Sequence, residues 1–128
     1  PALHNYYERY YQKVQEALKG WDKSREDRLF HGAPAAIIVA ADRRSSCPAE
    51  DALLASQNIL LMAEALDLGS CLIGYVVEAA RRDPSINRLL DLDKNYRIHS
   101  VVALGYPAVN WMRPVGRKAV KPEILASI

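Results

Sequence analysis

The sequence predicts a domain that combines helices with strands and is organised around one long, apolar helix. This helix follows Cys47 and Pro48 and is expected to end at Gly69. Its large apolar side chains fall on nearly every side: Leu53, Leu54, Ile59, Leu60, Leu61, Met62 and Leu66. A helix that is apolar all round is buried, and roughly 20 residues would span about 30 Å, the width of a small domain. We therefore expect the other elements to pack around a long buried central helix.

Three short apolar runs predict strands. Residues 35–42 (AAIIVAAD) precede the long helix, residues 71–76 (CLIGYV) follow it, and residues 96–104 (YRIHSVVAL) come last. The continuous apolar run Ile37–Val39 in the first of them is typical of a strand that is covered on both faces.

Two further helices are predicted outside this core. Residues 3–19 carry apolar and tyrosine side chains at steps of three and four, and Gly20 is expected to end that helix. The tyrosine-rich stripe is interpreted as a packing face, with a lid over a flat ligand as the alternative. Asp83 and Pro84 are a typical helix start, which predicts a short helix after them.

Composition and charge exclude several classes of function. The 128 residues suffice for one domain with its own core, and the net charge of +2 is too small to indicate nucleic-acid binding. Charged and amide side chains within the long helix argue against a membrane span. Cys47 and Cys71 have no metal-binding spacing, so a reduced, cytoplasmic protein is expected.

The common catalytic motifs are absent. The sequence contains no GxGxxG, no GxxxxGK[ST] and no GxSxG. The three histidines, His4, His31 and His99, are not spaced for a metal site or a catalytic dyad. We therefore predict no catalytic side chain and no metal ligand.

Two features are compatible with a ligand. Gly74 lies within the predicted strand 71–76, where glycine often marks close approach of the backbone to a ligand or to a neighbouring element. Arg113, Arg117 and Lys118 form a small cationic cluster, which is either a solvated tail or a clamp for a phosphate group.

Several segments, taken in order and spacing, resemble the nitroreductase family of FMN-dependent oxidoreductases. The resemblance covers residues 30–120, and its segments are 31–39, 51–58, 66–74, 101–107 and the Arg117–Lys118 pair. It implies an α+β fold with a mixed sheet flanked by helices. It also implies a homodimer that binds FMN at the dimer interface.

The resemblance also implies which residues bind the cofactor. The backbone of Cys71, Leu72, Ile73 and Gly74 would run along the isoalloxazine ring, and Arg117, with Lys118 as a second candidate, would hold the FMN phosphate. NADH or NADPH would reduce the flavin, which would pass electrons to nitro or quinone-like acceptors. In such enzymes the cofactor carries the chemistry.

One part of the family pattern is missing. Family members begin with an Arg-Arg-Ser segment that binds the phosphate and ribityl chain, whereas Arg43-Arg44-Ser45 follows the wrong strand here. We expect residues 1–128 to form a single nitroreductase-like domain that corresponds to the C-terminal two-thirds of the family fold. We also expect this piece alone to bind FMN weakly.

Three functions are compatible with these observations. The first is an FMN-dependent NAD(P)H oxidoreductase of the nitroreductase type. The second is a non-catalytic, dimerising or ligand-binding module of this fold that has lost FMN. The third is a flavin enzyme with another substrate, such as a dehalogenase or a flavin-cleaving enzyme. A yellow purified protein would separate the first from the second.

Overall fold

The computed structural model describes residues 2–109, 112, 116 and 119, with only the backbone for residues 2–10. Seven elements follow one another along the chain. They are α1 (Ala2–Ser24), β1 (Ala35–Asp42), α2 (Pro48–Ala65), β2 (Gly69–Leu72), α3 (Gly74–Arg82), α4 (Ser85–Leu89) and β3 (Tyr96–Gly105).

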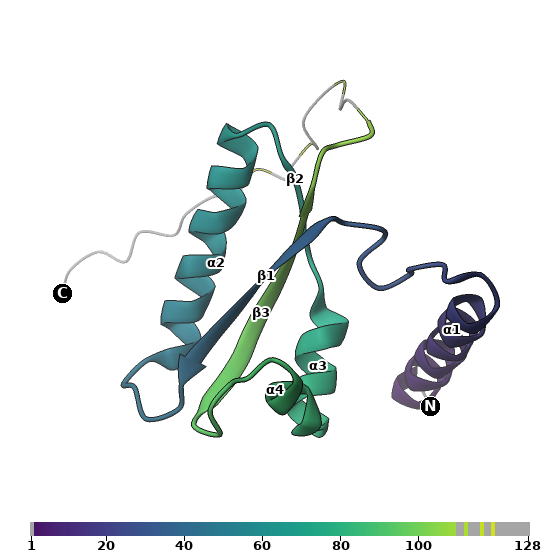
Figure 1. The fold of residues 1–128 in the computed structure, drawn as a ribbon, viewed down its shortest axis with the longest axis horizontal. Helices are drawn as coiled ribbons and strands as arrows, with labels where there is room; N and C mark the ends of the chain where they lie inside the picture. The colour runs from purple at the N-terminus through teal and green to yellow at the C-terminus, as the bar shows by residue number, and fades with distance from the viewer. Residues whose placement is uncertain (1, 110–111, 113–115, 117–118, 120–128) are drawn as a thin grey trace.

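The strands form one sheet of three in the order β1-β3-β2, so the last strand of the chain lies in the middle (Figure 1). Both pairs are antiparallel, with Ile37 opposite Val102 on one side of β3 and Cys71 opposite Ala103 on the other. The strands predicted at 35–42 and 96–104 are therefore confirmed. The one predicted at 71–76 lies instead at Gly69–Leu72, because α3 already begins at Gly74. The described strands make an antiparallel sheet rather than the mixed sheet that was predicted.

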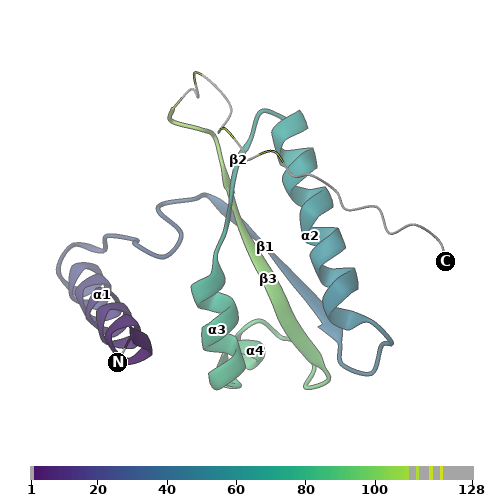
Figure 2. The same cartoon turned by 180° about the vertical axis from the view of Figure 1, so that it is seen from behind.

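Helices cover both faces of β3. Helix α2 lies along one face of the sheet, and α3 and α4 lie on the other face (Figures 1 and 2). On the α3 and α4 side, Ile98, Val101 and Ala103 of β3 form a buried cluster with Ile73. Val102 is completely buried. The second half of the strand, Val101 to Leu104, is apolar throughout because both of its faces are covered.

A buried pair of serines joins α2 to β3. The Ser56 hydroxyl donates to the Ala52 carbonyl oxygen at 2.6 Å and is also hydrogen-bonded to the Ser100 hydroxyl. A hydroxyl has one proton to donate, so Ser100 is the donor in the bond between the two serines. Both side chains are thereby satisfied inside an apolar layer, and this bond fixes α2 in position along β3.

The prediction that the long helix is buried on all sides is wrong for this chain. Among its residues only Ala52, Ser56 and Ala63 are buried. Five large apolar side chains are between 59% and 66% exposed: Leu53, Leu54, Leu61, Met62 and Leu66. The physical reason is that the sheet covers one side of α2, and no other described element covers the opposite side.

Helix α2 also ends earlier than predicted, and not at a glycine. Asp67 takes the left-handed position with φ 57°, the Asp67 N–H bonds to the Glu64 carbonyl, and the Leu68 N–H bonds to the Ala63 carbonyl at 2.8 Å. These bonds are those of a Schellman cap, in which a short polar residue can replace glycine. Gly69 is free to begin β2.

Helix α1 continues through Gly20 instead of ending there. It lies apart from the sheet in both views (Figures 1 and 2). Its described apolar side chains Tyr11, Leu18 and Trp21 are exposed, so the predicted packing face is not covered by the described part of the chain. None of the helices in that part combines the length and apolar character needed to cross a membrane.

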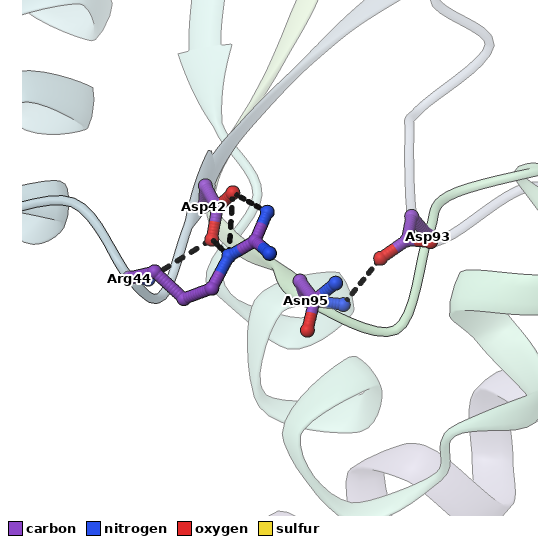
Figure 3. Close-up of polar contacts among 4 residues, drawn as sticks. All are labelled: Asp42, Arg44, Asp93 and Asn95. Carbon is purple, nitrogen blue, oxygen red and sulfur yellow. Dashed lines mark hydrogen bonds and ion pairs between the residues drawn. The ribbon is translucent and has the colours of Figure 1, made fainter.

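The turn after β1 is held by a carboxylate. The Arg44 guanidinium donates to Asp42 through Nε at 2.9 Å and Nη2 at 2.6 Å, and the Arg44 backbone N–H also donates to Oδ1 (Figure 3). The Arg43 N–H bonds to the carbonyl of Asn95, which lies in the turn before β3. Bonds from the Arg44 side chain, followed by the Arg44 N–H, lower the pKa of Asp42 from 3.8 to about 2.

This turn generates a pH prediction. Because the pKa of Asp42 is lower in the folded than in the unfolded chain, its contribution to stability is complete above pH ~4 and is lost as the pH falls toward 2. An NMR titration of the Asp42 carboxyl carbon should give a midpoint near 2, and Arg44→Gln should raise it. Arg82→Gln, which removes an arginine paired with Glu78 instead, should leave it unchanged. A wild-type midpoint near the ordinary value of 3.8 would contradict this description.

Candidate functional site

The four residues predicted to lie along a flavin meet at the junction of β2 and α3. Cys71 and Leu72 end the strand and are exposed. Ile73 is buried in the core, and its N–H donates to the Val101 carbonyl at 2.8 Å. Gly74 is exposed and is the first residue of α3. The side chain of Ile73 therefore anchors the segment, while its neighbours face outward.

Gly74 was predicted to lie inside a strand, but it lies at the start of helix α3. A Cβ atom built on Gly74 would meet nothing within 4 Å, and its φ is not in the left-handed region. Neither a close neighbour nor the backbone conformation therefore requires glycine here. Of the two interpretations of this residue, packing of another element is wrong for the described chain, and approach of a ligand stays a prediction.

The junction can bind an electron-rich group. The first N–H groups of any helix have no partner within it, and the aligned peptide dipoles leave a partial positive charge at that end. The residue that precedes α3, Ile73, makes no side-chain cap. An exposed strand end, an uncapped helix start and open space at Gly74 together fit the edge of a flat ring that accepts hydrogen bonds.

The predicted phosphate ligands, Arg117 and Lys118, lie outside the described residues, so their role stays a prediction. Cys47 and Cys71 are both free and exposed, and the reduced, cytoplasmic character inferred from them also stays a prediction. In the described part of the chain, no group of three or more His, Cys, Asp or Glu side chains could hold a metal ion.

The histidine of β3 has an unusual environment. His99 is half-buried, and its Nε2 atom has no hydrogen-bond partner among the described residues. Burial, followed by the charge of Arg97, lowers its pKa, so the ring is neutral at pH 7. His99 falls at the irregularity in the pairing of β1 with β3, where Val39 is opposite Ser100 and Ala40 opposite Ile98.

One feature of this site was missed in the sequence. Residues 74–82 form a helix, whereas the sequence predicted that a strand continues to Val76. The signal was present, because Val76, Val77 and Ala80 fall at helical spacing and pack on the core, while Glu78 and Arg82 alternate with them and are exposed. Because residues 71–76 are almost all apolar, the change from the two-residue period of a strand to the 3.6-residue period of a helix was not recognised there.

Comparison with known proteins agrees with this arrangement. The model of the nitroreductase family matches residues 3–106. A protein of Archaeoglobus fulgidus, provisionally named NADH dehydrogenase/NAD(P)H nitroreductase, is 38% identical over 85 residues, which are 62% of this chain and 48% of that protein. A protein of the same provisional name from Methanothermobacter thermautotrophicus is 42% identical over 86 residues, covering 64% of this chain and 44% of that protein.

A solved structure is similar to most of the chain. The nitroreductase with bound FMN from Desulfitobacterium hafniense DCB-2 has a TM-score of 0.60 and 25% identity, over 77% of this chain and 54% of that chain. The chain thus spans about half the length of these proteins. Because the family match takes in residues 3–106, the resemblance inferred from the sequence is confirmed, and this chain belongs to the nitroreductase family.

Proposed function

We propose that this chain provides the flavin-binding part of an FMN-dependent NAD(P)H oxidoreductase that reduces nitro or quinone-like acceptors. The observation that supports it best is the open junction of β2 and α3, where exposed Gly74 has empty space around it. The family membership and the FMN bound in the Desulfitobacterium hafniense relative agree with this choice. We further propose that residues 1–128 form a single nitroreductase-like domain.

When bound, FMN would supply the redox chemistry, accepting a hydride and passing electrons on. The chain would supply position and electrostatics. The backbone of residues 71–74 would lie along the ring, held rigidly because Ile73 is buried and bonded to Val101. The positive end of α3 would favour negative charge at the ring edge that it faces. Arg117, assisted by Lys118, would hold the phosphate group by charge-assisted hydrogen bonds.

We also propose that the protein acts as a homodimer. The outward side of α2 presents five large apolar side chains that are more than half exposed (Leu53, Leu54, Leu61, Met62 and Leu66). Monomeric proteins rarely expose contiguous apolar patches of this kind, and larger ones mark interfaces. A second copy of the chain would bury these side chains symmetrically, each helix covering the other.

The flavin proposal is tested by titrating the 128-residue chain with FMN and following flavin absorbance and fluorescence. Gly74→Ala should weaken binding at least about tenfold, or ~1.4 kcal/mol, because its methyl group would occupy the space assigned to the ring. The same change should not lower the melting temperature, since alanine in a compatible backbone position stabilises by about 0.4–1 kcal/mol. Arg117→Ala should also weaken binding.

Two matched variants control for general effects. Gly20→Ala makes the same change within α1, and Arg82→Ala removes an exposed arginine that pairs with Glu78. Both should bind FMN like the wild type. Saturable binding that Gly74→Ala leaves unaltered would contradict the proposed position of the ring. No binding at all would favour the alternative of a module that has lost its flavin.

The dimer is tested by changing its proposed centre. Leu54→Glu and Leu61→Glu should convert a wild-type dimer to a monomer in size-exclusion chromatography with light scattering, because each would bury an unpaired carboxylate. Leu89→Glu makes the same change at a side chain of α4 that is already 85% exposed, and should leave the dimer intact. A wild-type chain that stays monomeric at high concentration would refute the proposal.

A further inference from the structure

We propose a second binding site, for a phosphate group, in a cavity at the end of the sheet where β1 finishes and β3 begins. The cavity has a volume of about 280 Å³ and is lined by Arg43, Ala80, Arg81, Asn87, Arg97 and Ile98. None of the residues proposed to lie along the flavin, 71–74, is among them. Along α3, Gly74 begins the helix whereas Arg81 belongs to its last turn, so the two sites lie at opposite ends.

The fold brings the three arginines together from distant parts of the sequence. Arg97 is in β3 opposite Ala41 of β1, so Arg43, just beyond the end of β1, comes close to it. The Arg43 N–H is fixed by its 2.9 Å bond to the Asn95 carbonyl. Arg81 approaches from α3, which packs on the same face of the sheet as α4 (Figure 1).

The charge of this cluster is poorly compensated. The nearby carboxylate of Asp42 is engaged by Arg44, in three hydrogen bonds from its guanidinium (Figure 3). Glu78 pairs closely with Arg82, at 2.8 Å, and only at 3.6 Å with Arg81. Within the described part of the chain, Arg43 and Arg97 have no ion pair, and the lining includes no acidic residue.

Arg43, Arg81 and Arg97 make the lining positively charged, which favours an anion in the cavity. Guanidinium groups bind phosphate oxygens with paired, charge-assisted hydrogen bonds, which makes phosphate the matching class of anion. The cluster therefore has the composition of a phosphate site, although no sequence motif marks it.

Asn87 contributes an uncharged polar side chain to the lining. Its Nδ2 donates to the Tyr96 carbonyl at 3.1 Å, which fixes the orientation of the amide and leaves one N–H unused. Its Oδ1 atom is buried and has no hydrogen-bond partner among the described residues. Unsatisfied buried polar atoms are rare and often indicate a missing water or ligand. The remaining N–H of the Asn87 amide is a donor that suits a phosphate oxygen.

The proposal is tested by NMR on the 128-residue chain, titrated with inorganic phosphate and, separately, with chloride at matched ionic strength. Phosphate should produce saturable shifts of the Asn87 side-chain amide and the Arg97 backbone amide, and chloride should not. Arg97→Gln should weaken phosphate binding at least about tenfold, or ~1.4 kcal/mol. Arg43→Gln, at an exposed turn residue, gives the same test if Arg97→Gln perturbs the fold.

Arg82→Gln is the matched control, because Arg82 is in α3 beside Arg81 but does not line the cavity. Equal effects of Arg82→Gln and Arg97→Gln, or equal shifts with chloride, would overturn the proposal. A parallel titration with ribose 5-phosphate distinguishes the two sources: tighter binding than phosphate indicates a phosphate ester, and equal binding indicates free phosphate. Gly74→Ala should bind phosphate normally, so failure of the flavin proposal would be recognised separately.

Discussion

The burial of β3 between two helical layers is the constraint on which the rest of this structure depends. Ile98, Val101 and Val102 are at most 2% exposed, and they belong to the strand that pairs with both of the others. Removing the apolar surface of this strand from water is the main favourable term that holds the layers together. The Ser56 and Ser100 hydroxyls then fix how α2 is placed on it.

The same arrangement determines where functional surfaces can lie. Since β3 is covered on both faces, ligands reach the described part of the chain at the ends of the sheet, at its two edge strands and at the outer sides of the helices. The β2–α3 junction lies beside the middle of β3, where Leu72 is opposite Val102, and it has an anchored Ile73 next to an open Gly74. The end of the sheet where β1 finishes and β3 begins carries the cavity lined by three arginines. The outer side of α2 carries the exposed leucines, so the three proposals concern three separate surfaces.

The sequence predicted the elements well where one signal dominates. The strands 35–42 and 96–104 were recognised from apolar runs, and the family was recognised from the order of several weak motifs. The burial of α2 was predicted wrongly because the apolar pattern of a helix indicates only that its side chains need to be packed against something. The pattern does not indicate whether the packing partner belongs to the same chain or to another molecule.

The details of the candidate site depend on contacts that no local pattern encodes. Glycine was expected to end α2, but Asp67 does so, because a short polar side chain also tolerates the left-handed conformation. The arginine cavity arises from strand register, which places Arg97 opposite Ala41 and thereby near Arg43. A spacing motif cannot reveal residues that are brought together only by antiparallel pairing.

The most direct test of the central claim, that flavin lies against the β2–α3 junction, is hydrogen–deuterium exchange of the full chain with and without saturating FMN. The account predicts slower exchange of amides in residues 70–76, with little change in β1, which lies at the far edge of the sheet. Protection confined to residues 43, 81 and 97, with none at the junction, would mean that FMN binds the arginine cavity through its phosphate and that the junction is not its site.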